Sequence, residues 1–157
     1  MLWGSFSAKI DEKSRLRMPA KFRRDDQDTY FVTSYDGKHA KVFPIEVWER
    51  IARELQQYAG MDPVQQKLQR ITGYFGLVSQ MDPQGRIMIP QTLREAAKIS
   101  GDVVVIGATD HVEVWNEEIF RNQFVHDPLT TEELGGLAER INQQKQAAVS
   151  EPRMENK

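Results

Sequence analysis

The residues near the start of the chain that could do chemistry are cationic. Between residues 9 and 24 lie seven basic side chains and two acids, a local net charge of +5. The seven are Lys9, Lys13, Arg15, Arg17, Lys21, Arg23 and Arg24. Such a segment can bind the phosphates of a nucleic acid, or it can be a solvated surface that acids elsewhere balance. The charge alone favours the second interpretation.

The remaining residues argue against other kinds of chemistry. The absence of cysteine excludes a thiol nucleophile, a disulfide framework, an iron–sulfur cluster and a zinc finger. The histidines, at positions 39, 111 and 126, lack the HxxxH spacing of metal ligands, and neither a GxGxxG nor a Walker-type loop occurs. We therefore expect no catalytic residue, no metal, no cofactor and no small-molecule substrate.

The composition is that of a globular protein with a hydrophobic core. Of the 157 residues, 39% are hydrophobic and 28% charged, and the net charge is −2. Charge is unevenly distributed, because residues 110–157 hold ten acids against five basic residues. No apolar run approaches the roughly 18 residues of a membrane span, and the first residues lack the pattern of a secretory signal. We expect a cytoplasmic protein that does not bind membranes.

The sequence contains an internal duplication. Residues 11–19 (DEKSRLRMP) return as residues 82–90 (DPQGRIMIP), 71 positions later, and residues 31–48 align with residues 103–120 at an offset of 72. The second alignment pairs like residues: His39 with His111, Val42 with Val114, Phe43 with Trp115, and Trp48 with Phe120. Two matching blocks in the same order predict two copies of one structural unit.

Each copy is predicted as strand, turn, strand, short helix, strand, turn, strand. Asp82-Pro83-Gln84-Gly85 suits a type I turn followed by a left-handed glycine. The same turn in the first copy ends at Ser14, which we expect to be left-handed at a cost of about 1 to 2 kcal/mol. The strands around these turns are predicted at residues 6–10, 15–18, 77–81 and 86–89. Asp36-Gly37 predicts a two-residue turn between the strands FVTSY and KHAKVF.

Apolar spacing and capping residues predict the helices. Apolar residues recur at helical spacing from Ile45 to Tyr58, and Asp62-Pro63 is typical of a helix start. Asn116 is a predicted cap, and Thr130 with Glu133 forms a capping box. The predicted organisation is a first repeat with its helix (1–58), a helical linker (59–76), a second repeat (77–126), a C-terminal helix (127–148) and a disordered tail (149–157).

The duplicated turn motif resembles that of the MraZ family, bacterial transcriptional regulators of the division and cell-wall gene cluster. In the first copy the residues that match the family pattern Asp-x-Lys-Gly-Arg-Leu-x-x-Pro are Asp11, Lys13, Arg15, Leu16 and Pro19, with Ser14 at the glycine position. In the second copy they are Asp82, Gly85, Arg86, Ile87 and Pro90, with Gln84 at the lysine position. The resemblance spans about residues 1–141.

This resemblance implies an α+β fold, a duplicated AbrB-like swapped-hairpin β-barrel with flanking helices. It implies that the two halves of one chain form the unit that AbrB-like regulators build from two subunits. It also implies a ring-like homo-oligomer that binds repeated short elements upstream of the gene cluster and represses it. The expected partners are double-stranded DNA at promoter repeats and further copies of the chain, and the expected location is the nucleoid.

The basic first hairpin is the predicted DNA-binding site. Arg15 is predicted to contact a base or a phosphate, because its planar guanidinium can grip either with two hydrogen bonds. Lys13 in the loop and Arg17, which shares a strand face with Arg15, are predicted phosphate contacts. Lys9 and Lys21 are predicted to extend this site, as are two further arginines at positions 23 and 24.

A structural role competes with DNA contact for the two motif arginines. Asp11 and Arg15 lie across one turn, as do Asp82 and Arg86, and either ion pair could hold its hairpin. We favour the ion pair for Arg86, whose surroundings are neutral, and DNA contact for Arg15, whose neighbours are basic. The alternative for the whole protein is an oligomeric interaction or scaffold protein with an AbrB-like fold and no specific DNA target.

Overall fold

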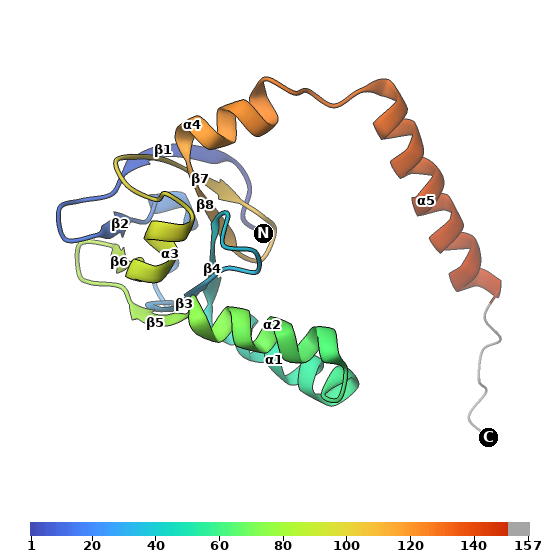
Figure 1. Ribbon diagram of the computed structural model, residues 1–157, viewed down its shortest axis with the longest axis horizontal. Helices are drawn as coiled ribbons and strands as arrows, with labels where there is room; N and C mark the ends of the chain where they lie inside the picture. The colour runs from blue at the N-terminus through green and yellow to red at the C-terminus, as the bar shows by residue number, and fades with distance from the viewer. Residues whose placement is uncertain (151–157) are drawn as a thin grey trace. The chain divides into compact units, whose positions relative to one another are not determined.

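Strands of the first repeat pair with strands of the second (Figure 1). The computed structural model describes residues 1–150. Its strands are β1 (Ser5–Lys9), β2 (Arg15–Arg17), β3 (Thr29–Thr33), β4 (Ala40–Pro44), β5 (Leu77–Gln80), β6 (Arg86–Met88), β7 (Asp102–Gly107) and β8 (Val112–Asn116). Its α-helices are α1 (Ile45–Ala59), α2 (Pro63–Tyr74), α3 (Gln91–Ala96), α4 (Glu117–Phe120) and α5 (Thr131–Ser150), with a short 3-10 helix η1 (Ala20–Phe22) and a short π-helix η2 (Arg121–Val125).

Two compact units make up the chain, Met1–Arg121 and the part from Asn122 on, and the described strands all lie in the first. Six strands form an antiparallel sheet in the order β1-β7-β8-β4-β3-β5, and β2 pairs with β6 in a separate ribbon. Each strand has a repeat mate, the equivalent strand of the other copy. Replacing every strand by its repeat mate reverses this order, so a pseudo-twofold axis passes between β4 and β8. Because β1 pairs with β7 and β5 with β3, the predicted exchange of hairpins between the copies is confirmed.

The predicted α+β class is confirmed, but the described strands do not close into a barrel. The sheet ends at β1 and at β5, each with one partner strand in it. The three-residue strands β2 and β6 pair with each other in a separate two-stranded sheet, with Leu16 opposite Ile87. They therefore do not connect the two edges of the six-stranded sheet, β1 and β5. One core connects the ribbon, the sheet, η1 and α3. Its fully buried members include Leu16, Met18, Val32, Val42, Ile87, Ile89, Leu93, Val103, Val105 and Val114.

Aromatic side chains join the helices to the other face of the sheet. Trp48 of α1 stacks on Phe31, with ring centroids 4.7 Å apart, and lies 5.2 Å from the Phe43 ring. Phe120 of α4 packs edge-on against Trp115 at 5.7 Å. Since Trp48 and Phe120 are repeat mates, as are Phe43 and Trp115, both copies attach their following helix in the same way.

The predicted helix caps are confirmed. Asp62 Oδ1 accepts a hydrogen bond of 2.7 Å from the amide of Val64, at the start of α2. Asn116 caps α4 by accepting a bond of 3.0 Å from the amide three residues on. At α5, the Glu133 amide donates to Thr130 Oγ1 and the Thr130 amide donates to Glu133 Oε1, both at 3.1 Å. These bonds satisfy amide groups that a helix leaves unpaired at its start.

The predicted two-residue turn at Asp36-Gly37 is wrong. Strands β3 and β4 are joined by residues 34–39. Ser34 Oγ accepts a bond of 2.9 Å from the amide of Gly37, and Asp36 Oδ1 accepts one of 2.9 Å from the amide of Lys38. These side chains satisfy the loop amides that a tight hairpin would pair with backbone carbonyls, so the loop is wider.

Helix α5 begins at Thr131 and ends at Ser150. The first two residues of the predicted tail, 149–157, are therefore helical, and residues 151–157 lie outside the described residues. Among the described residues, no helix is long and apolar enough to cross a membrane.

A charged cluster lies on the pseudo-twofold axis, where Lys41 of β4 is opposite Glu113 of β8. Lys41 Nζ lies 3.1 Å from Glu113 Oε2, and Trp115 Nε1 donates to Glu113 Oε1 at 3.0 Å. The ring nitrogens Nε2 of His39 and His111 lie 3.4 and 3.9 Å from Glu113 Oε2. Interaction with the imidazoles of His111 and His39 holds the pKa of Glu113 far below its ordinary value, although burial opposes this.

We expect this carboxylate to stabilise the fold except in acid. A depressed pKa contributes stability that is complete above the unfolded-state pKa, about 4.5, and is lost as the pH falls towards the folded-state pKa. The melting temperature should therefore fall between about pH 5 and pH 3, and by less in Glu113→Gln, which is less stable at neutral pH. Thermal unfolding of both proteins across this range measures the difference. Equal falls would contradict this role for Glu113.

Candidate nucleic-acid interface

The first hairpin turn is held by one aspartate. Asp11 Oδ1 accepts bonds of 2.9 Å from the amides of Lys13 and Arg15, and its Oδ2 accepts a bond of 3.0 Å from Arg15 Nε. The backbone bond from Arg15 is the main cause that lowers the pKa of Asp11. Ser14 is left-handed, with φ of 66°, as predicted. The turn is therefore closed by hydrogen bonds to a charged acceptor, which are stronger than neutral ones.

The second hairpin turn has the same structure. Asp82 Oδ1 accepts bonds of 2.9 Å from the amides of Gln84 and Arg86, and Arg86 Nε donates to Asp82 Oδ2 at 2.8 Å. Gly85 is left-handed, with φ of 79°. The structure thus places Arg15 and Arg86 in equivalent ion pairs with the aspartates of their own turns, although the local charge had favoured the ion pair for Arg86 alone. Arg15 Nη1 also lies 3.8 Å from Asp82 Oδ2 of the other turn. The Asp–Arg pair holds the turn in both copies.

The two turns lie against each other. Met18 N donates to Gly85 O at 2.8 Å, and its repeat mate Ile89 N donates to Ser14 O at 3.3 Å. Arg17 Nε also donates to Gln84 O at 3.2 Å, in the loop of the other hairpin. Sequence reasoning missed this contact, because nothing local indicates which loop an exposed arginine will reach. The two hairpins therefore present one joint surface.

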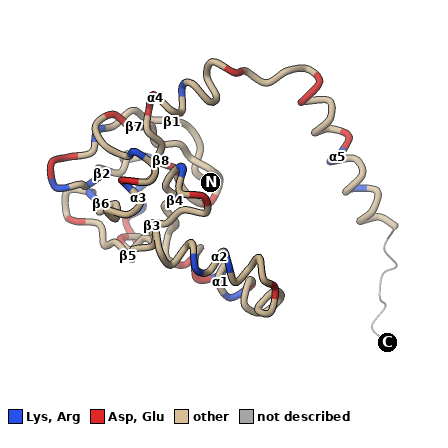
Figure 2. Tube along the Cα trace, viewed as in Figure 1, with Lys and Arg blue, Asp and Glu red and all other residues tan. Residues whose placement is uncertain are grey.

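The exposed side chains of the two hairpins differ in charge. Four basic residues of the first hairpin and of η1 directly after it are exposed, and we call them the basic strip: Lys9, Lys13, Arg17 and Lys21. Their counterparts 71 positions later are all uncharged: Gln80, Gln84, Met88 and Thr92. Figure 2, in which lysine and arginine are blue, shows where these charges lie along the chain. The turn is common to both copies, whereas the strip belongs to the first copy alone.

The two remaining arginines of the basic segment make contacts within the protein. The guanidinium of Arg23 lies over Gly85, where a Cβ atom would be 2.3 Å from Arg23 Nη1. Arg24 forms ion pairs of 3.4 Å with Asp26 and 3.9 Å with Glu46. Arg23 therefore packs on the second turn, and any side chain at position 85 would meet it.

Comparison with known proteins identifies the family. The family model described as “MraZ protein, putative antitoxin-like” matches residues 78–133. The transcriptional regulator MraZ of Acidobacterium capsulatum is 41% identical over 143 residues, which cover 88% of this chain and 98% of that protein. The chain belongs to the MraZ family. The same name is given to relatives from Koribacter versatilis, 41% identical over 85% of this chain and 94% of the relative, and Leuconostoc mesenteroides, 33% identical over 88% and 95%.

The two repeat histidines of this MraZ-family chain pack against aromatic rings. His39 stacks on Trp115, with ring centroids 4.2 Å apart, and His111 stacks on Phe43 at 4.7 Å. Across the described residues, 1–150, no three histidine, aspartate or glutamate side chains are grouped so that they could hold a metal ion. The strand-facing structural role predicted for the two repeat histidines agrees with these contacts.

Proposed function

We propose that this chain is a DNA-binding transcriptional repressor that acts on repeated elements upstream of the division and cell-wall gene cluster. The observation that carries the proposal is the basic strip, which belongs to one of two copies that share the same turn structure. Its relatives are named transcriptional regulators, which agrees with a nucleic-acid partner. In this proposal residues 1–58 and 77–126 are the two repeats, and the protein acts at the nucleoid.

The strip supplies phosphate contacts, and the turn positions them. Lys13 in the loop and Arg17 on β2 project charge from a backbone that the Asp11 bonds hold in one conformation. Among the guanidinium nitrogens of Arg15, only Nε donates to Asp11, and Asp82 Oδ2 lies 3.8 Å from Arg15 Nη1. In this proposal the guanidinium therefore contacts a base or a phosphate mainly through Nη2. A short β-ribbon such as β2–β6 is narrow enough to enter the major groove.

Self-association completes the proposed mechanism. One copy of the strip offers few phosphate contacts, so the affinity of a single chain is weak and falls steeply with salt. A ring-like homo-oligomer places several strips on successive DNA repeats, which raises the overall affinity through effective concentration. This arrangement allows a chain with a net charge of −2 to occupy an operator.

The two motif arginines provide a matched test. Arg15→Ala is expected to weaken binding to DNA from upstream of the chain's own gene by about tenfold, and Arg86→Ala by less than about twofold. Both variants lose the bond from Nε to the aspartate of their own turn, and Arg15→Ala also loses the 3.8 Å ion pair with Asp82. The free energy of unfolding of Arg15→Ala should therefore fall by as much as that of Arg86→Ala or slightly more. A mobility-shift assay with thermal unfolding in parallel measures both quantities.

Equal loss of DNA binding in the two variants would contradict the assigned roles, since both hairpins would then bind or both arginines would act only through the fold. If the unchanged protein fails to shift this DNA, the scaffold alternative is the better description.

A further inference from the structure

A cavity of 470 Å³ lies beside the start of α1, between the N-terminus, the segment that follows η1 and the turn before β8. We call it the Tyr30 cavity. The side chains that line it include Leu2, Phe22, Gln27, Tyr30 and Val47. Its volume falls within the range of about 300–1,000 Å³ that is typical of small-molecule sites.

Two polar atoms in these lining residues are buried and have no hydrogen-bond partner among the described residues: the Tyr30 hydroxyl and Gln27 Oε1. Tyr30 is 2% exposed and Gln27 is 4% exposed. Gln27 Nε2 donates to the carbonyl of Thr29, so reversing the amide would break that bond. Burial raises the pKa of the Tyr30 hydroxyl, which therefore stays protonated at neutral pH and can donate. Buried polar atoms in folded proteins are usually hydrogen-bonded, so each of these two atoms needs a hydrogen-bond partner.

The charged residues that line the cavity balance one another. Arg24 Nη2 lies 3.9 Å from Glu46 Oε2, and Arg50 Nη2 lies 3.6 Å from Asp110 Oδ2. Two arginines and two acids leave the side chains of the cavity lining without net charge. An anionic ligand would compete with Glu46 and Asp110 for these arginines, so the lining favours an uncharged ligand.

We propose that the Tyr30 cavity binds a small, neutral molecule with a carboxamide group on an apolar body. A carboxamide has one strong acceptor and N–H donors, which match the Tyr30 hydroxyl and Gln27 Oε1, two atoms that bond to none of the described residues. The apolar body packs on Leu2, Phe22 and Val47. Pockets of this kind combine mostly apolar walls with a few polar groups that orient the ligand.

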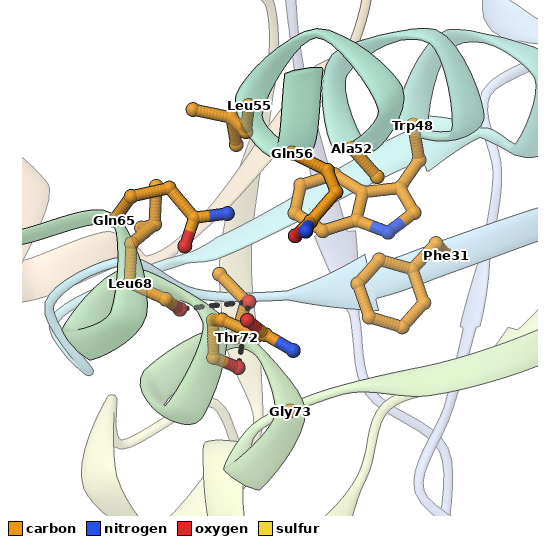
Figure 3. A pocket seen from close by; sticks show the side chains of 10 residues that line it. Phe31, Trp48, Ala52, Leu55, Gln56, Gln65, Leu68, Thr72 and Gly73 are labelled. Atoms are coloured by element: carbon orange, nitrogen blue, oxygen red, sulfur yellow. Dashed lines mark hydrogen bonds between the residues drawn. The ribbon is translucent and has the colours of Figure 1, made fainter. Parts of the chain in front are cut away.

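A second cavity in the same unit offers a control. It measures 350 Å³ and lies between α1 and α2 over β3, with Phe31, Trp48, Leu55 and Leu68 among its walls (Figure 3). Gln65 lines it and is 9% exposed, and its Oε1 also lacks a partner among the described residues. A ligand of the Tyr30 cavity should be insensitive to Gln65, since this glutamine belongs to the other cavity.

The Tyr30 cavity adjoins the basic segment. Phe22 lines it and packs edge-on against Phe6 of β1, with ring centroids 5.2 Å apart, and Lys21 of the basic strip directly precedes Phe22. A ligand there contacts the segment that follows the first hairpin. Any consequence for DNA binding rests on the proposed function, but the binding of the ligand does not.

Benzamide is a suitable probe, with benzoate as its charged counterpart. Titration of the ¹⁵N-labelled full chain, followed by amide chemical shifts, is expected to show saturable binding with a Kd of about 1 mM. The shifts should centre on residues 22–30 and 46–50. Tyr30→Phe and Gln27→Leu should each weaken binding by about tenfold, whereas Gln65→Leu should leave it unchanged. Tyr30→Phe should keep its melting temperature, because it removes a hydroxyl that bonds to none of the described residues.

Three results would overturn the proposal. The first is the absence of saturable shifts at about 10 mM benzamide, which would mean that water and not a ligand fills the cavity. The second is tighter binding of benzoate than of benzamide, which would make the arginines an anion site. The third is loss of binding in Gln65→Leu with retention in Tyr30→Phe, which would place the ligand between α1 and α2. None of these measurements uses DNA, so failure here is separate from failure of the proposed function.

Discussion

Replacing Lys13 by glutamine and Arg17 by methionine is expected to weaken DNA binding by about 100-fold at moderate salt, because two charge-assisted contacts to phosphate are lost. Glutamine and methionine are the residues at the equivalent positions of the second hairpin, 84 and 88, which forms the same turn. Both replaced side chains are exposed, and the only bond lost within the described residues is the one from Arg17 Nε to Gln84 O, so the free energy of unfolding should fall by no more than about 1 kcal/mol. Fluorescence anisotropy with promoter DNA measures the affinity, and urea unfolding measures the stability.

A control with the same change in charge is available on α2. Lys67 and Arg70 are exposed and belong to neither hairpin. Lys67→Gln with Arg70→Met should reduce the affinity by less than about threefold, because only long-range attraction to DNA is lost. If this control loses as much affinity as the hairpin variant, total charge and not the strip would govern binding.

Leu16→Ala is expected to lower the free energy of unfolding by about 3 kcal/mol, the usual cost of a cavity in a packed core. Leu16 is fully buried and lies opposite Ile87 at the centre of the β2–β6 ribbon, where the two repeats meet. Its truncation removes apolar contacts of both repeats at once. Equilibrium urea unfolding measures the loss.

The pseudo-twofold axis predicts a matching result in the second copy. Ile87→Ala should cost about as much as Leu16→Ala, while Met88→Ala, at a position that is 40% exposed, should cost less than about 1 kcal/mol. If Leu16→Ala proves as mild as Met88→Ala, the ribbon does not form the centre of the core.

Local features of the fold could be predicted from the sequence because they depend on neighbouring residues. The repeated Asp-x-x-(Ser/Gly)-Arg motif contains every group that closes the turn, so left-handed Ser14 and Gly85 followed from it. The capping residues Asp62 and Asn116 likewise act within three positions along the chain. Such bonds join groups that are always close in space.

Contacts between distant segments could not be predicted in this way. The turn motif predicted β1 and β5 as the strands that enter the two turns, but it does not identify the partner strand of either. The expected exchange between copies came from the family resemblance. The charge around Arg15 did not show that Asp11 binds it as Asp82 binds Arg86. Gln27 and Tyr30 carried no signal in the sequence, since their significance depends on a cavity that distant segments form.

The salt dependence of DNA affinity tests the basic strip most directly. The logarithm of the association constant falls linearly with the logarithm of salt concentration, by about 0.9 for each phosphate neutralised. Removing both Lys13 and Arg17 should therefore make the slope per chain shallower by about 1.8, while the Lys67 and Arg70 control keeps the original slope. An unchanged slope in the hairpin variant, with the assembly intact, would show that these side chains do not contact the DNA backbone.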